Sequence, residues 1–360
     1  MKKIYGIFRG FPGLGRVMAG MSLLSQLQRG RKCDIRVYTY AQGNTVLDYF
    51  GFDRRIDIEP APNQITSLGL DPVSAPAARL IEDIIKWQPD LIIIDGEPLV
   101  QQLLGVCYDE RKIVALLNPR DIDNDSLPYS TQRFFIEAFS RANTAIVHGF
   151  DLSNRQERKY GQCRIFYTNT IIRPEIIAMK PIKGKRVVSC ILGGGSKFAD
   201  TGFIDGTVNL GVALIKIAAE TKDIKFRLFC NDQVVRGRIK EFAVSDNVEI
   251  CETFGEPEQV YKDADIIVCR AGRNTISEVL YLDLPCIVVA VGRDYRAKEQ
   301  ISNIENIIKG YPNSVAYWDG DDIGSLQTKI HDALLVDKAE NGFIPGNEDA
   351  LRLINQLLGE

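Results

Sequence analysis

Histidine is nearly absent from the 360-residue sequence, which has only two, at positions 148 and 331. A metal site built from several histidines is therefore excluded. The eight cysteines form no CxxC pair, so neither a zinc site nor a disulfide framework is indicated. Cys190, Cys269 and Cys286 lie within apolar, strand-like runs, as buried reduced cysteine does in cytoplasmic proteins. We expect a cytoplasmic chain without a bound metal.

Long apolar runs are also missing. No uninterrupted apolar segment approaches the roughly 18 residues that a membrane-spanning helix needs, and the basic start MKKIYGIFRGF turns into PGLGR where a signal peptide would continue. The net charge of −3 does not suggest nucleic acid as a partner. Acidic residues are absent from positions 1–32, which hold seven Lys or Arg. This basic stretch suits a phosphorylated ligand or peripheral contact with an anionic membrane, or is simply a solvated surface.

Apolar, β-branched runs alternate with segments of helical period along the whole chain. Such alternation predicts βαβ units and parallel sheets, and the length favours two domains. The predicted strands lie near 3–8, 34–39, 90–94, 112–117, 144–148, 186–192, 224–229, 247–250, 265–269, 285–291 and 313–317. The predicted helices include 14–29, 72–87, 205–219, 273–281, 295–308 and 322–335. We expect an α/β fold of two doubly wound, Rossmann-like domains.

The boundary between these domains is expected near 170–186, which holds two prolines, a glycine and a charge cluster. This gives an amino-terminal domain at 1–174 and a carboxyl-terminal domain at 185–345. The amphipathic segment 346–360 is expected to form a helix that packs back on the amino-terminal domain.

The first motif is ILGGGSKF, residues 191–198, where a predicted strand ends in three glycines. In open α/β sheets ligands bind beyond the carboxyl ends of the strands. Glycines let backbone N–H groups approach a phosphate, so Gly194, Gly195 and Ser196 are candidate phosphate ligands. The stretch matches neither the P-loop nor the GxGxxG pattern, and a tight turn is the alternative interpretation.

The second motif is CRAGRNTISEVLYLDLP, residues 269–285, which runs from a strand end into a helix. Asn274 or Thr275 is expected to cap that helix, whose start favours anionic groups. Glu278, one turn later, can accept two hydroxyl hydrogens from a ribose. Arg270 and Gly272 complete the candidate site. The alternative is a capped helix with a solvated glutamate.

The third motif is VGRDYRAKEQISN, residues 291–303, after the next strand. Glu299, Gln300 and Asn303 offer donors and acceptors to a polyhydroxylated ligand. An exposed amphipathic helix is the alternative interpretation.

The order GGGS, CRAG·NT·SE, LP and EQ··N resembles the donor half of GT-B glycosyltransferases. It is most similar to the family that includes the peptidoglycan N-acetylglucosaminyltransferase and its small bacterial and archaeal relatives. The resemblance implies two domains that face a central cleft, with the glycine loop and the following helix at the donor diphosphate. It also implies that Glu278 holds the ribose, that Glu299 and Gln300 contact the donor sugar, and that the backbone around Phe254 holds the base.

The amino-terminal half carries the same resemblance. FPGLGRVMAGMSLLSQLQRG, residues 11–30, is similar to the family's GLGH··R loop and first helix, but Arg16 replaces the histidine. Guanidinium remains protonated and cannot act as a base, so Arg16 is expected to stabilise the departing diphosphate. Asp95 and Glu97, at the end of the strand LIIID, are the first candidates for the base, and His148 is the second.

These expectations combine into one hypothesis with alternatives. The chain is expected to be an inverting, metal-independent glycosyltransferase that uses a nucleotide-sugar, a UDP-sugar, and no cofactor. The acceptor is a glycan, a lipid-linked sugar or a small molecule, and the enzyme is cytoplasmic or peripheral at the inner membrane face. Phe134, Phe135 and Phe139 form either an apolar patch for a lipid-linked acceptor or part of the core. The alternatives are a catalytically weak GT-B-like partner protein and a nucleotide-sugar hydrolase or epimerase.

Overall fold

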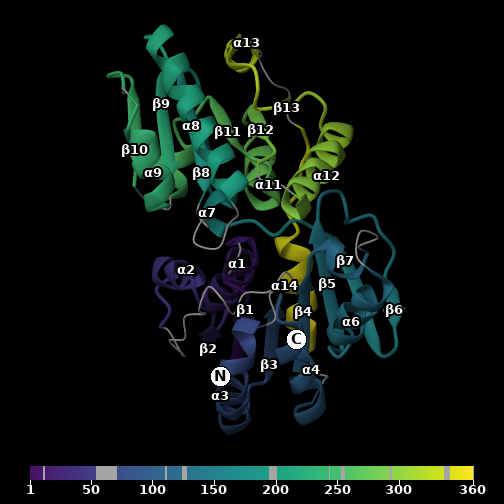
Figure 1. Cartoon of the computed structure of the whole chain (residues 1–360). Helices are drawn as coiled ribbons and strands as arrows, with labels where there is room; N and C mark the ends of the chain where they lie inside the picture. Colours follow the sequence, from purple (N-terminus) through teal and green to yellow (C-terminus); the bar gives the residue numbers. More distant parts are fainter. Residues whose placement is uncertain are drawn as a thin grey trace. The chain divides into compact units, whose positions relative to one another are not determined.

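The computed structural model describes residues 1–10, 13–53, 71–109, 112–123, 128–193, 201–242, 244–252, 256–291, 294–335 and 341–359; for 71–78, 201 and 294–299 it describes the backbone alone. The chain divides into two compact units (Figure 1). Unit 1 comprises Met1–Ile172 and Pro345–Glu360, and unit 2 comprises Arg173–Ile344. The boundary was expected near 170–186, and the structure places it between Ile172 and Arg173.

Unit 1 is built on one sheet with the strand order β2-β1-β3-β4-β5-β7-β6. Its neighbours are parallel except for the antiparallel pair β6 and β7. The strands are β1 Lys2–Phe8, β2 Cys33–Tyr38, β3 Leu91–Asp95, β4 Ile113–Leu117, β5 Thr144–Gly149, β6 Arg158–Tyr160 and β7 Cys163–Asn169. The helices are α1 Gly15–Gly30, α2 Gly43–Phe50, α3 Asp71–Trp87, α4 Pro98–Cys107, α5 Pro119–Ile122, α6 Tyr129–Phe139 and α14 Asn347–Leu357.

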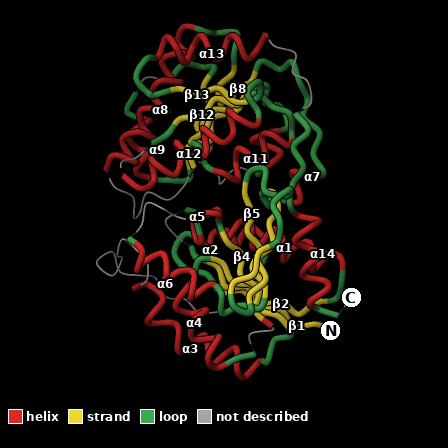
Figure 2. The backbone as a smooth tube through the Cα atoms, turned by 90° about the vertical axis from the view of Figure 1, so that its right-hand side faces the viewer, coloured by secondary structure: helices red, strands yellow, loops and turns green. Residues whose placement is uncertain are grey.

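The sheet of unit 1 is covered on both faces. Figure 2 shows its yellow strands with α1 and α14 on one side and α3, α4 and α6 on the other. Strands β3, β4 and β5 are buried along their whole length. Burial on both faces explains why their sequences are continuous apolar runs and why they could be predicted.

Unit 2 contains a second, wholly parallel sheet with the order β10-β9-β8-β11-β12-β13. Its strands are β8 Val187–Gly193, β9 Lys225–Cys230, β10 Val248–Cys251, β11 Ile266–Arg270, β12 Cys286–Val289 and β13 Val315–Trp318. Its helices are α7 Pro174–Ile177, α8 Thr201–Glu220, α9 Gln233–Lys240, α10 Pro257–Tyr261, α11 Arg273–Tyr281, α12 Asp294–Gly310 and α13 Ile323–Leu335. The prediction of two doubly wound α/β domains is confirmed.

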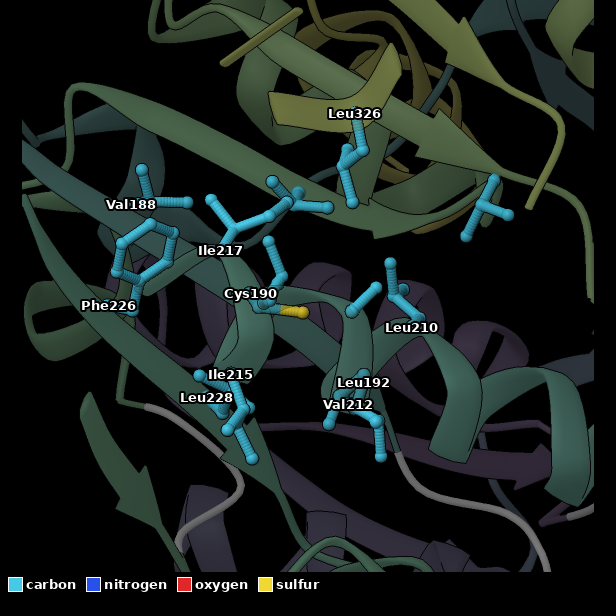
Figure 3. Packing of buried hydrophobic residues seen from close by; sticks show 14 of the residues in the cluster. Val188, Cys190, Leu192, Leu210, Val212, Ile215, Ile217, Phe226, Leu228 and Leu326 are labelled. Atoms are coloured by element: carbon cyan, nitrogen blue, oxygen red, sulfur yellow. The ribbon is translucent and has the colours of Figure 1, made fainter. Parts of the chain in front are cut away.

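The core of unit 2 lies between α8 and its sheet (Figure 3). Val188, Cys190 and Leu192 alternate along β8 and point to the same face, where Leu210 and Ile217 of α8 pack against them. By length and composition α8 is also apolar enough to cross a membrane. Its position over this sheet explains that apolarity as core packing. All eight cysteines of the chain are free thiols.

Strand order places one switch point in each sheet. Numbered within unit 2, the order is 3-2-1-4-5-6, and the order reverses between β8 and β11. In unit 1 the corresponding reversal lies between β1 and β3. Ligands of open α/β sheets bind in the crevice outside the carboxyl ends of the strands at such a point. Arg16, Asp95 and Glu97 lie at or after the ends of β1 and β3, and the residues of the first two motifs lie at or after the ends of β8 and β11.

Candidate active site

The switch point of unit 2 gathers the predicted donor-binding residues of the second motif. Gly193 ends β8 with a φ of +71°, and a Cβ built there would lie 2.0 Å from Arg270 Nη2. A side chain at this φ would be strained and would displace the tip of the guanidinium, which also lies over the Phe203 ring at 4.5 Å from its centroid. Arg270 thus lies at the end of β8, directly before the glycine-rich loop. Gly194, Gly195, Ser196 and Phe254 lie outside the described residues.

Helix α11 begins beside this cation. Gly272 is its N-cap, and no side chain caps it. The expectation that Asn274 or Thr275 caps the helix is therefore wrong, because both residues already lie inside its first turn. Both are half-buried. A first turn without a side-chain cap leaves its backbone groups to other partners, and the macrodipole favours an anion there.

Glu278 is buried within an ion pair instead of being solvated. Arg173 donates from Nε to Oε1 and from Nη2 to Oε2, both at 2.7 Å. Tyr261 OH donates to Oε2 at 2.8 Å. The side chains of Arg173 and Glu278 are 8% and 4% exposed. Burial, followed by the charge of Glu278, raises the pKa of Tyr261 well above its usual range, so this hydroxyl remains a donor.

Two residues of the third motif, Gln300 and Asn303, form hydrogen bonds with the backbone. The Gln300 side chain donates to the Val291 carbonyl at 2.7 Å and accepts from the Val291 N–H at 3.2 Å, so its amide is used on the backbone. Asn303 donates to the Ala271 carbonyl at 3.4 Å. The side chain of Glu299 is outside the described part of the chain. The contact of Glu299 and Gln300 with a donor sugar stays a prediction.

The switch point of unit 1 brings three of the four predicted catalytic residues together. Arg16 donates to Asp95 Oδ1 and forms a bidentate pair with Asp121 at 2.9 and 2.7 Å. Burial alone would lower the pKa of Arg16, but Asp121 and Asp95 outweigh it and raise that pKa further. The pKa of Asp121 is lowered, because Arg16 outweighs the effect of burial. Arg16 is therefore held between two carboxyl groups, and its expected role at a departing diphosphate stays a prediction.

Glu97 lies next to this ion-paired group but has different partners. Tyr40 OH donates to Glu97 Oε1 at 2.6 Å, and Arg9 Nε lies 3.8 Å from the same oxygen. Glu97 is completely buried, and its Oε2 has no hydrogen-bond partner among the described residues. Burial raises the pKa of Glu97 to about 7, against the opposing effects of Arg9, Tyr40 and Arg16.

Two glycines allow this packing. Gly96 has a φ of +80°, and a Cβ there would lie 2.6 Å from Arg16 Cδ and 2.9 Å from Arg9 Cβ. A Cβ on Gly10 would lie 1.7 Å from the Tyr40 carbonyl oxygen. The backbone after β1 and β3 therefore approaches the arginines and Tyr40 as closely as glycine permits.

His148 does not join this cluster. It lies on β5, two strands beyond β3 in the sheet, and is fully buried. Its Nδ1 accepts a hydrogen bond of 3.5 Å from the backbone N–H of Ile171. The aromatic residues of α6 are divided: Phe139 is buried in the core, whereas Phe134 and Phe135 are half-buried.

Sequence reasoning missed five side chains of these clusters. The positions of Arg9 and Tyr40 could have been found, because Arg9 directly follows β1 and Tyr40 closely follows the neighbouring strand β2. Asp121 lies in α5, and Arg173 and Tyr261 come from segments far from Glu278 in sequence. No local pattern indicates their partners.

Comparisons with known proteins agree with this fold. Residues 216–340 match the glycosyltransferase family 28 C-terminal domain. A UDP-N-acetylglucosamine–N-acetylmuramyl-(pentapeptide) pyrophosphoryl-undecaprenol N-acetylglucosamine transferase from Rickettsia canadensis is 24% identical over 79% of this chain and 78% of its own length. The crystal structure of Acinetobacter baumannii MurG superimposes with a TM-score of 0.56 at 13% identity, over 99% of this chain and 100% of that one. The UDP-GlcNAc 2-epimerase from Neisseria meningitidis, bound to UDP-GlcNAc, gives a TM-score of 0.61 at 15% identity, over 99% of each chain.

Proposed function

We propose that this chain, a GT-B glycosyltransferase resembling the peptidoglycan N-acetylglucosaminyltransferase family, transfers a sugar from a UDP-sugar to an acceptor hydroxyl with inversion at the anomeric carbon. The observation that carries the proposal is the placement of Arg270 at the switch point of unit 2, against Gly193 and beside the start of α11. A guanidinium and a helix N-terminus at one strand end together favour a diphosphate. The donor in the name of the Rickettsia relative supports a uridine nucleotide.

The surroundings of Glu278 refine its part in the proposed donor site. A carboxylate has about four acceptor positions, and Arg173 and Tyr261 use three of them. One ribose hydroxyl can therefore be accepted without breaking the ion pair, in place of the two hydroxyls expected from the sequence. Arg173 and Tyr261 hold the carboxylate in one orientation, which lowers the ordering cost when the nucleoside binds.

The proposed reaction needs no metal ion. As the bond between the anomeric carbon and the diphosphate breaks, negative charge grows on the leaving oxygen, and Arg270 is the cation proposed to stabilise it. The acceptor is a glycan, a lipid-linked sugar or a small molecule, and the lipid-linked substrate in the name of the Rickettsia relative supports the second of these.

Calorimetric titration with UDP and uridine tests the diphosphate assignment. Arg270→Met keeps an apolar chain on Phe203 but removes the charge, so UDP affinity should fall about tenfold to a hundredfold, as for a lost charge-assisted hydrogen bond. Uridine affinity should change little. Glu249→Gln is a matched control, since Glu249 is a half-exposed carboxylate on the far strand β10. Wild-type protein that binds no uridine nucleotide would refute the proposal.

Product analysis separates the transferase from its alternatives. Incubation with UDP-N-acetylglucosamine and candidate acceptors should yield UDP and a glycosylated acceptor. A 2-epimerised UDP-sugar would indicate an epimerase, and binding without any reaction would indicate a partner protein.

A peripheral membrane position is also part of the proposal. Leu103 and Val106, three residues apart on one face of α4, are 46% and 81% exposed. Apolar side chains on this surface suit contact with a bilayer that carries a lipid-linked acceptor. Leu103→Ser/Val106→Ser should reduce cosedimentation with anionic vesicles, and unchanged sedimentation would refute this membrane contact.

A further inference from the structure

The carboxylates at the switch point of unit 1 have different partners. Arg16 binds Asp95 through one carboxylate oxygen and Asp121 through both. Glu97 instead keeps one buried oxygen, Oε2, without a hydrogen-bond partner among the described residues. A buried acceptor without a donor costs about 1–3 kcal/mol or more, so such atoms mark places where a donor from outside the fold is needed. A water or a ligand hydroxyl can supply a donor at Oε2.

We infer that Glu97 is the general base of the transfer reaction, that its Oε2 receives the proton of the acceptor hydroxyl, and that Tyr40 is the positioning residue that holds it. This inference rests on the proposed function. The hydrogen bond from Tyr40 at 2.6 Å fixes Oε1 and thereby orients Oε2. Arg9, whose side chain is 14% exposed, lies 3.8 Å from Oε1 and not at Oε2.

The neighbouring groups are poorer bases for physical reasons. Asp95 accepts from the guanidinium of Arg16 through Oδ1, and an adjacent cation favours the charged form of a carboxylate and so makes it a weaker base. Arg16 itself is permanently protonated. His148 lies two strands away and already binds the Ile171 backbone. Glu97 is a carboxyl at this switch point that is not in a direct ion pair with Arg16, and its Oε2 has no hydrogen-bond partner among the described residues.

The pKa of Glu97 suits a general base. The charged or titratable groups that face Glu97 are Arg9, Arg16, Asp95, Tyr38 and Tyr40. Burial is the largest influence and brings the pKa to about 7. A base is most effective when its pKa lies near the working pH, because it is then both available and strong enough.

The chemical step balances without any further reactant. The acceptor O–H bond breaks, and its proton moves to Glu97 Oε2. The acceptor oxygen forms a bond to the anomeric carbon, and the bond from that carbon to the diphosphate oxygen breaks. UDP leaves with the electron pair, and the protonated carboxyl of Glu97 returns its proton to solvent.

The test uses UDP-N-acetylglucosamine as the donor and water as the acceptor, with UDP release measured from about pH 5 to about 9. Wild-type release should rise as the Glu97 carboxyl ionises, with a midpoint near the pKa of about 7. Glu97→Gln should lower the rate about 10²- to 10⁴-fold while calorimetric affinity for UDP stays unchanged. Tyr40→Phe should move the midpoint to higher pH, because the Tyr40 hydrogen bond lowers the pKa of Glu97.

The surface pair Tyr160 and Glu137, joined at 3.2 Å, supplies matched controls in the same unit. Glu137→Gln and Tyr160→Phe should leave both rate and midpoint unchanged. A wild-type rate in Glu97→Gln, an unmoved midpoint in Tyr40→Phe, or no UDP release by wild-type protein that binds the donor would each overturn the inference and leave the donor site standing. Absence of donor binding would instead remove the proposed function itself.

Discussion

Glu97 should make unit 1 less stable as the pH rises towards neutrality. Its pKa is about 7 in the folded unit, against an ordinary value of 4.5 in an unfolded chain. Between these values the folded unit keeps a proton that the unfolded chain has lost, so the free energy of unfolding falls as pH increases. The difference of 2.5 in pKa, at about 1.4 kcal/mol for each pKa unit, corresponds to a loss of about 3.5 kcal/mol that is complete above pH 7.

The two tryptophans of the chain make this loss measurable in one unit. Trp87 lies in unit 1 and Trp318 in unit 2, so a Trp318→Phe background leaves Trp87 as the reporter of unit 1. Urea unfolding would be followed by Trp87 fluorescence at about pH 5 and about pH 8. Part of this loss falls below pH 5, where the unfolded carboxyl already ionises. Relative to the same protein with Glu97→Gln, which cannot ionise, the protein with Glu97 should therefore lose about 2.5 kcal/mol between these conditions.

Every other titrating group contributes equally to both proteins and cancels in this comparison. The control Glu137→Gln should show the same pH dependence as the protein with Glu97 intact. If the curves for Glu97 and Glu97→Gln run parallel between the two pH values, the carboxyl does not titrate near neutrality and the account of its burial is wrong.

Three further perturbations test the packing. Gly96→Ala and Gly51→Ala both place a Cβ at positive φ, which costs about 1 kcal/mol, but only Gly96 also meets an arginine side chain at 2.6 Å; equal losses in urea unfolding would contradict this contact. Arg173→Met should destabilise unit 2 by about 3–5 kcal/mol, because Glu278 stays buried without its guanidinium; adding Glu278→Leu should restore most of it, and Trp318 fluorescence would report both. Ellman's reagent should react first with Cys107, the one exposed thiol, and a fast phase that survives in Cys107→Ser would refute this.

The sequence was informative where the physics is local. The parallel strands are buried on both faces, so their apolar runs marked them, and the carboxyl ends of β1 and β3 had to bring Arg16, Asp95 and Glu97 close together. The hairpin of β6 and β7 was not predicted, because β6 is the short, charged stretch Arg-Lys-Tyr.

Partner choice could not be predicted from the sequence. Arg16 meets Asp121, and Arg173 meets Glu278, each across 105 positions. Nothing in the neighbourhood of Glu278 distinguishes a solvated carboxylate from one held by a distant guanidinium, since both follow the same helical pattern. Only the packing of β11, α10 and the segment after Ile172 decides between them.

The return of residues 345–359 to unit 1 has a consequence for biosynthesis. Asn347 joins α14 to this unit. Its side-chain oxygen accepts a hydrogen bond from the Ile172 N–H at 3.0 Å, and its side-chain nitrogen donates to the Ile172 carbonyl at 2.9 Å and to Gln26 at 2.7 Å. The ribosome translates all of unit 2 before it reaches this helix. Synthesis of unit 1 therefore starts before that of unit 2 but ends after it. A nascent chain halted at residue 344 lacks α14, so the surfaces of α1 and β7 that α14 covers are open to chaperones.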